Sequence, residues 1–342
     1  MRYVVFLAIL FTLFSCNRNA DQSADISPIK LIRFDKDLRA FDTNQFEQSD
    51  EIMIKKYGEL YSFYIEDLMG LGKQSPKTDE DYYQKYIPRF LSGEYPAMMD
   101  SCEKYVIKDI DKIEKSITES YANLIGLFPE KKPSKVFSFF ISPMGANPQA
   151  AFSYGNDTIG INWFNYLGRD FGLYKPIYEG YTYMIEWNSQ EYIPRNIMLV
   201  EYNLLKEKHK TNEELSELIY KMIEEGKKMY FLDLVCKQIP EHTKIGYNEA
   251  QLKWCRENEF EIWAYFKENK LLYSLDNLEA KRYTEEGPST PGMPQGSPGM
   301  VGTWTGWQIV KKYMSSHHIP MSKLMEMSPK EIFKNSEYKP EK

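Results

Sequence analysis

The stretch Lys135-Val136-Phe137-Ser138-Phe139-Phe140-Ile141 is the clearest β-strand in the sequence. Its β-branched and aromatic residues suit a pleated, buried surface. Further along, residues 151–162 hold two short apolar segments around Gly155-Asn156-Asp157, which is the pattern of a β-hairpin. A third segment, Leu31-Ile32-Arg33-Phe34, also has strand character. Together these segments predict a small antiparallel sheet.

Helical patterns flank this sheet on both sides, because apolar residues recur at helical spacing before it and after it. Asn248 and Gln251 form a predicted capping box at the start of one of these helices. Residues 285–302 contain four prolines and five glycines and are predicted to form a loop. The order of elements predicts a mainly helical α+β domain, with helices at 42–71, 79–127, 195–209, 212–230, 248–269 and 304–314.

The charge and cysteine content exclude several classes of protein. The 342-residue chain has a formal net charge of −6 and no block of basic residues, so nucleic-acid binding is not expected. Apart from Cys16, the cysteines are Cys102, Cys236 and Cys255, an odd number that leaves at least one thiol free. The sequence has no Cys-x-x-Cys pair, so neither a redox motif nor a cysteine zinc site is predicted.

The first sixteen residues have the pattern of a bacterial lipoprotein signal. Arg2 is followed by an apolar run over residues 4–14, which is shorter than the roughly 20 residues that a membrane-spanning helix needs. The run ends in Leu13-Phe14-Ser15-Cys16, a lipobox. We therefore predict that residues 1–15 are a cleaved signal peptide and that the Cys16 thiol carries diacylglycerol.

The predicted mature chain starts with a tether. Residues 16–27 are polar and would connect the lipidated cysteine to a single domain at residues 28–342. Asn17, and not aspartate, follows the cysteine, so nothing marks retention in the inner membrane and the outer membrane is the expected location. The protein would contact the membrane through its lipid anchor.

Two glutamates lie on apolar faces of predicted helices. Glu259 falls within the apolar stripe of the 248–269 helix, and Glu201 has apolar neighbours one turn away on either side. A buried carboxylate must be paired, hydrogen-bonded or protonated. The structural interpretation is an ion pair with Arg195 or Arg282 for Glu259, and a local partner for Glu201. The functional interpretation is an acid–base or binding carboxylate.

Motifs for catalysis or cofactor binding are not found in the sequence. The histidines are His209, His242, His317 and His318, and no two of them have the spacing of zinc ligands on a helix. There is no Gly-x-Ser-x-Gly nucleophile elbow, and no P-loop or Rossmann glycine pattern follows a strand. No cofactor is therefore predicted.

Several segments together resemble one protein family. The most specific is Pro298-Gly299-Met300-Val301-Gly302-Thr303-Trp304-Thr305-Gly306-Trp307-Gln308-Ile309-Val310, and others are Ile32-Arg33-Phe34-Asp35 and Glu225-Gly226-Lys227-Lys228-Met229-Tyr230. Over residues 28–340 the chain is similar to the gliding-motility lipoproteins of the GldB family of Bacteroidetes. The resemblance implies a role in gliding, or in envelope machinery linked to it, with envelope protein partners. The candidate structural or binding residues of the motif are Trp304, Gly306, Trp307 and Gln308.

The same family is distantly similar to zinc proteases that carry a His-Glu-x-x-His helix. This resemblance implies a zincin-type fold, with Glu201 at the position of the general base and Glu225 at that of the third metal ligand. Val200 and Leu204 stand where the two histidines would be, and neither side chain offers a lone pair to a metal. The resemblance therefore implies a degenerate site that holds no metal.

These observations leave three functions open. The expected one is a lipid-anchored, non-enzymatic accessory or binding component of envelope machinery of the gliding or secretion type. The loop at 287–302 and the aromatic surface would then contact partners. One alternative is a peptidase or other hydrolase that uses carboxylates such as Glu201 and Glu259. The other is a surface protein that binds glycan or peptide, which only the 26 tyrosines and 6 tryptophans favour.

Overall fold

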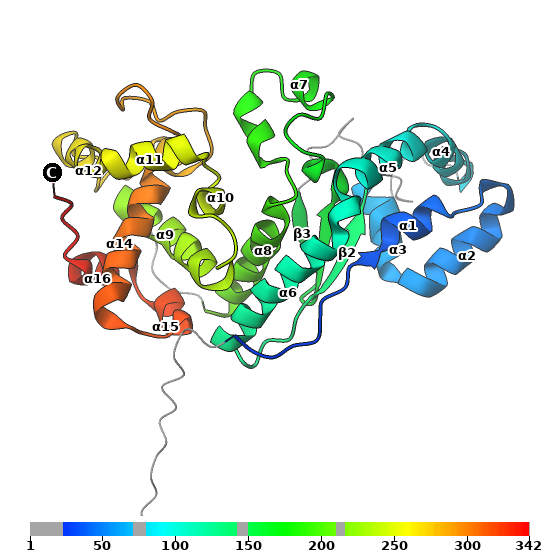
Figure 1. Ribbon diagram of the computed structural model, residues 1–342, viewed down its shortest axis with the longest axis horizontal. Helices are drawn as coiled ribbons and strands as arrows, with labels where there is room; N and C mark the ends of the chain where they lie inside the picture. Colours follow the sequence, from blue (N-terminus) through cyan, green and yellow to red (C-terminus); the bar gives the residue numbers. More distant parts are fainter. Residues whose placement is uncertain (1–22, 71–79, 142–149, 210–215, 342) are drawn as a thin grey trace, which may run out of the picture.

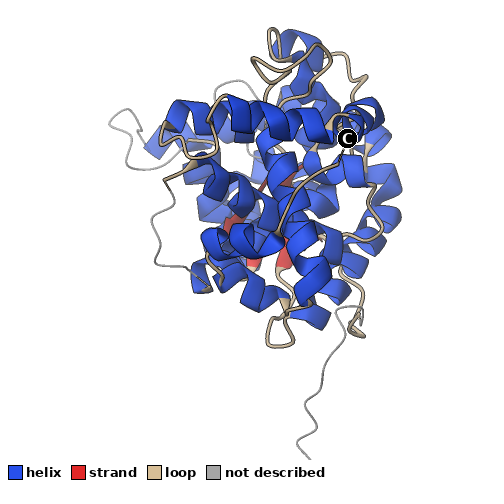
Figure 2. Cartoon of the chain, turned by 90° about the vertical axis from the view of Figure 1, so that its left-hand side faces the viewer, coloured by secondary structure: helices blue, strands red, loops and turns tan. Residues whose placement is uncertain are grey.

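The structure is a computed structural model that describes residues 23–70, 80–141, 150–209 and 216–341. These residues form a mainly helical molecule with one small sheet (Figure 1). Figure 2 shows the strands lying among the helices. The predicted α+β class is confirmed. In the described part of the chain, no helix has both the length and the apolar character needed to cross a membrane.

The sheet of the described residues has four strands in the order β1-β2-β4-β3. β1 (Ile32–Arg33) runs parallel to β2 (Lys135–Phe139), and β2 runs parallel to β4 (Thr158–Asn162). β3 (Ala151–Tyr154) and β4 form the predicted antiparallel hairpin. The prediction of an antiparallel sheet is wrong for the other two pairs. A long helical connection separates β1 from β2, and such crossovers are how neighbouring parallel strands are joined.

The connection between β1 and β2 is broken into more helices than predicted. The predicted helix at 42–71 is interrupted at Gly58, whose φ of +54° does not fit a right-handed helix. The α-helices are α1 (Phe34–Arg39), α2 (Phe46–Tyr57), α3 (Glu59–Phe63), α4 (Glu80–Ser92), α5 (Glu94–Tyr105) and α6 (Ile110–Leu127), with a π-helical turn at Tyr64–Leu68 and 3-10 turns at Thr43–Gln45 and Ile107–Asp109.

Most of the described chain after the sheet is also helical. The predicted helix at 248–269 is two helices, and at the break the Asn258 side chain turns back to donate to the Trp254 carbonyl at 2.8 Å. The predicted capping box of Asn248 and Gln251 is confirmed. The helices are α7 (Tyr174–Ile177), α8 (Tyr192–Lys208), α9 (Leu218–Val235), α10 (Glu241–Ile245), α11 (Glu249–Glu257), α12 (Glu259–Glu268), α13 (Asn277–Thr284), α14 (Val301–His317), α15 (Met321–Glu326) and α16 (Pro329–Ser336), with 3-10 turns at Trp163–Tyr166 and Thr182–Trp187.

Helices α9 and α14 cross at two glycines. A Cβ atom on Gly226 would lie 2.3 Å from the backbone of Gly306, and a Cβ atom on Gly306 would lie 1.7 Å from the Met222 carbonyl oxygen. No side chain fits at such distances, so only glycine lets the two backbones approach this closely. Trp304 and Trp307, on either side of Gly306 in the sequence, are both buried. The motif that is most specific in the sequence therefore has a structural role.

Replacing Gly306 by alanine is expected to destabilise the fold by about 2 kcal/mol or more, because the added methyl group must push α9 and α14 apart. Gly172→Ala is a matched control, since nothing lies within 4 Å of a Cβ atom at Gly172. Chemical denaturation of both variants measures the free energy of unfolding. A Gly306→Ala protein as stable as the wild type would contradict this description of the crossing.

Candidate functional site

Glu201, the predicted catalytic candidate on α8, is fully buried. Tyr121 and Ser134 donate hydrogen bonds to its Oε1 atom at 2.8 and 2.5 Å, and Lys131 Nζ lies 2.7 Å from its Oε2 atom. Burial raises the pKa of Tyr121, and the Glu201 carboxylate raises it further. Glu201 is thus held in a buried ion pair with two added hydrogen bonds. The expectation of a local partner is wrong, because all three partners lie outside α8.

Glu259 has a different environment from the one predicted. Because the helix breaks at Asn258, Glu259 begins α12 and is half-buried instead of lying at the centre of an apolar stripe. Its Oε1 atom accepts a hydrogen bond from Tyr338 Oη at 2.7 Å. Burial raises the pKa of Tyr338, and Glu259 adds to this effect. The partner of Glu259 is therefore a C-terminal tyrosine, and the predicted ion pair with Arg195 or Arg282 is wrong.

The remaining positions of the expected zinc site are not assembled around Glu201. Val200 and Leu204 are half-buried on α8. Glu225 on α9 forms an ion pair with Lys228 at 2.6 Å, and in the part of the chain that the structure describes it shares no partner with Glu201. Among the described residues, no group of three or more His, Cys, Asp or Glu side chains is placed to hold a metal ion.

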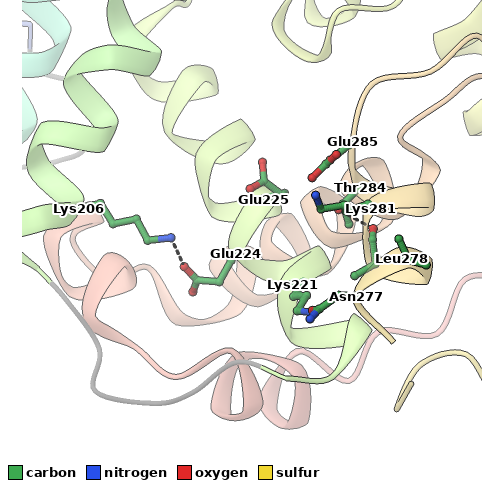
Figure 3. A pocket seen from close by; sticks show the side chains of 10 residues that line it. Lys206, Lys221, Glu224, Glu225, Asn277, Leu278, Lys281, Thr284 and Glu285 are labelled. Carbon is green, nitrogen blue, oxygen red and sulfur yellow. Dashed lines mark hydrogen bonds and ion pairs between the residues drawn. The ribbon is translucent and has the colours of Figure 1, made fainter. Parts of the chain in front are cut away.

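Glu225 lines a surface hollow of about 560 Å³ (Figure 3). The hollow lies between the end of α8, the first half of α9 and the helix α13. Its charges are balanced in sign, because Lys206, Lys221 and Lys281 face Glu224, Glu225 and Glu285.

Glu224 is held by two lysines. Its carboxylate lies 2.8 Å from Lys206 Nζ and 2.6 Å from Lys227 Nζ. Lys227 is fully buried and also donates to the Met327 carbonyl at 2.6 Å. Burial by itself raises the pKa of Glu224, but the two lysines outweigh burial and lower the pKa below its ordinary value. This cluster was not predicted, although a glutamate and a lysine three residues apart on an apolar helix are a signal for it.

Exposed apolar side chains lie on α13 and just before it in the sequence. Tyr273, Leu275 and Leu278 are 62, 65 and 72% exposed, and Leu278 lines the hollow itself. Lys221 Nζ donates to Asn277 Oδ1 at 2.6 Å and so connects α9 to α13. A charge-balanced hollow with an apolar edge can offer another polypeptide both hydrogen bonds and apolar contacts.

The loop that is rich in proline and glycine lies against the body of the protein. Ser297, Pro298 and Gly299 are buried, and Tyr247 Oη donates to the Gly299 carbonyl at 2.6 Å. The Thr290 hydroxyl donates to the Pro298 carbonyl at 2.7 Å. The predicted loop is confirmed, and its role in partner contact remains a prediction for the residues that are exposed.

The fold and the hollow define a helix-rich α+β protein whose candidate catalytic carboxylates are engaged in ion pairs or hydrogen bonds. Over residues 15–340 the sequence matches the model of the family described as gliding motility protein GldB, and the chain belongs to that family. No curated protein and no solved structure matches the chain. The expected similarity to zinc proteases and the zincin-type fold find no support in these comparisons.

The ion cluster at Glu224 should make stability depend on pH. Because the folded-state pKa of Glu224 lies below the ordinary value of 4.5, the cluster stabilises the fold above pH 4.5, and this contribution is lost as the pH falls through the folded-state pKa. We expect Glu224→Gln to be less stable than the wild type at neutral pH, and the two stability curves to converge in acid. Denaturation at a series of pH values measures this convergence.

The matched control is Glu207→Gln, which changes an exposed glutamate on the same α8 that supplies Lys206. Its stability should follow the wild-type curve at every pH. If the gap between Glu224→Gln and the wild type stays constant from neutral to acid pH, the ion cluster does not stabilise the fold as described.

Proposed function

We propose that this protein is a lipid-anchored accessory component of gliding or secretion-type machinery in the cell envelope, and that it acts by binding other proteins. Membership of the gliding motility protein GldB family supports the link to gliding machinery. The predicted lipobox, Leu13-Phe14-Ser15-Cys16, supports the anchor and lies outside the described residues. Asn17 after the cysteine supports an outer-membrane location.

The state of Glu201 is the observation that carries the non-enzymatic part of the proposal. A general base must reach the proton that it removes, within about 3.2 Å or through one water. Glu201 is instead fully buried, with Tyr121, Ser134 and Lys131 on its two oxygens. Stoichiometric zinc in the purified protein, or peptidase activity that Glu201→Gln abolishes, would contradict a non-enzymatic role.

The hollow beside α13 is the partner surface that we propose. Its occupant would be a segment of an envelope protein with both charged and apolar side chains. Paired charges of both signs in the hollow favour a mixed polypeptide over a strongly charged polymer. The exposed side chains of Tyr273, Leu275 and Leu278 would supply the apolar contacts.

Leu278→Asp is expected to abolish capture of the envelope partner, because it places a charge in the apolar part of this surface. The full-length lipidated protein is used as bait in detergent-solubilised envelopes, and bound proteins are quantified by mass spectrometry. Ile52→Asp is a matched control, since Ile52 is 57% exposed on α2, outside the hollow. Equal capture by the two variants, or no reproducible partner of the wild type, would contradict the proposed surface.

Cys16→Ser removes the only atom to which the lipid could be attached at the lipobox. We expect the variant protein to appear in the soluble fraction of disrupted cells, because the lipid on Cys16 is the predicted membrane anchor. The variant should keep its fold but lose its function. Cell fractionation, together with thermal unfolding of the released protein, measures both outcomes. Full function of a released Cys16→Ser protein would show that the anchor is not needed at the site of action.

A further inference from the structure

Residues 23–31, the first part of the chain that the structure describes, lie along α6, and we call them the strap. The Ser23 hydroxyl donates to Asn123 Oδ1 at 2.6 Å. The Ala24 amide donates to the Ala122 carbonyl at 2.9 Å. Both acceptors lie in the last two turns of α6, so the strap meets the folded body at the end of this helix.

The strap then continues along α6 towards the start of that helix. The Ile29 amide donates to Thr118 Oγ1 and the Leu31 amide donates to Glu114 Oε1, each at 2.9 Å. The side chains of Ile26 and Ile29 pack against the hydrophobic core. Hydrogen bonds and apolar contacts thus fix the strap to α6 along its length.

Little chain remains between the strap and the predicted lipid anchor. Residues 23–27 are part of the predicted tether, and the structure places them against the folded body. Cys16 and Ser23 are seven residues apart, and seven residues span at most about 25 Å. A lipid on the Cys16 thiol would therefore keep the end of α6 within about 25 Å of the anchored cysteine.

The ends of α8 and α15 join the end of α6 on one side of the molecule, which we call the α6 pole. The Phe128 ring, just after α6, lies 6.3 Å from the His209 ring at the end of α8. His209 Nδ1 lies 2.9 Å from Glu326 Oε1, in the last residue of α15. Exposed residues of the loop after α6 include Glu130 and Lys132, so the pole carries charges of both signs.

The segment around α7 lies at the opposite end of the molecule (Figure 1). Gln190, just before α8, donates to Asp109 Oδ2, just before α6, at 3.4 Å, so these two helices start together as well as end together. α8 has 17 residues and is about 26 Å long. A tether of at most about 25 Å therefore favours an arrangement in which the end of α6 faces the membrane and α7 faces away from it.

We propose that the α6 pole faces the lipid surface, because the strap and the short tether hold it there. This proposal rests on the lipid anchor of the proposed function. It also deepens that function, since Lys206 in the last turn of α8 lines the hollow beside α13. A partner in the hollow would then be a segment of an envelope protein that lies close to the membrane.

The test measures energy transfer from a dye on the protein to lipids. Full-length lipidated protein is reconstituted into vesicles of phosphatidylethanolamine and phosphatidylglycerol that contain a headgroup-labelled acceptor lipid. The donor dye is attached to Lys132→Cys at the α6 pole, or to Tyr181→Cys next to α7, and both positions are exposed. The dye should react with the introduced thiol, because burial protects Cys102, Cys236 and Cys255. We expect transfer from position 132 to be about twofold stronger or more, because the short tether holds this position nearer the lipid.

A longer tether provides a second measurement. Insertion of about twenty glycine and serine residues between Ala20 and Asp21 leaves the described residues unchanged and adds about 25 Å of average reach. We expect transfer from position 132 to fall by about half or more, because the α6 pole is no longer held near the lipid. Flotation of the protein with the vesicles should not change.

Flotation separates this proposal from the proposed function. A protein that does not float with the vesicles lacks the anchor, and that result overturns both. A floating protein with equal transfer from positions 132 and 181, or with stronger transfer from position 181, overturns the orientation alone. Equal transfer from position 132 with and without the insertion overturns the role of the short tether.

Discussion

The close crossing of α9 and α14 at Gly226 and Gly306 is the contact on which the C-terminal half of the molecule depends. α9 carries Glu224, Glu225 and Lys227, so its position sets one wall of the hollow. The crossing also brings Trp307 Nε1 within 2.8 Å of Asp233, and Asp233 binds Lys244 of α10 at 3.0 Å. Through this chain of contacts, the glycine crossing fixes α10, whose Lys244 carbonyl orients Arg195.

Local patterns predicted the elements of the fold better than their pairing. The strand at Lys135–Phe139 and the hairpin that follows were predicted because their residue types act locally. The parallel direction of β1 and β2 was not predicted. It depends on a helical connection of about a hundred residues and not on the strands themselves. The break at Asn258 was missed because the apolar spacing continues across it.

Burial of the candidate site residues could be predicted in part, and their partners could not. The apolar neighbours of Glu201 indicated a buried carboxylate, and the structure agrees. Its partners Tyr121, Ser134 and Lys131 lie about seventy or eighty residues away in the chain, where no local pattern points to them. For Glu259 even the burial was overestimated, because the apolar stripe assumed one unbroken helix.

Some buried charged side chains are paired within the fold, whereas Arg195 has no carboxylate partner among the described residues. Glu201 and Glu224 are stabilised by lysines and are part of the folded core. Arg195 is held by neutral groups and keeps an unused donor.

The most direct test of the central claim replaces the Glu201–Lys131 ion pair as a unit. The Glu201→Gln/Lys131→Met protein loses both charges and leaves neither one unpaired, so it should fold. It is expressed in a gliding host that lacks its own family member and in which the wild-type protein restores colony spreading. Our account predicts that the double variant restores spreading as the wild type does. A folded, membrane-bound double variant that fails to restore spreading would contradict the claim that Glu201 is structural.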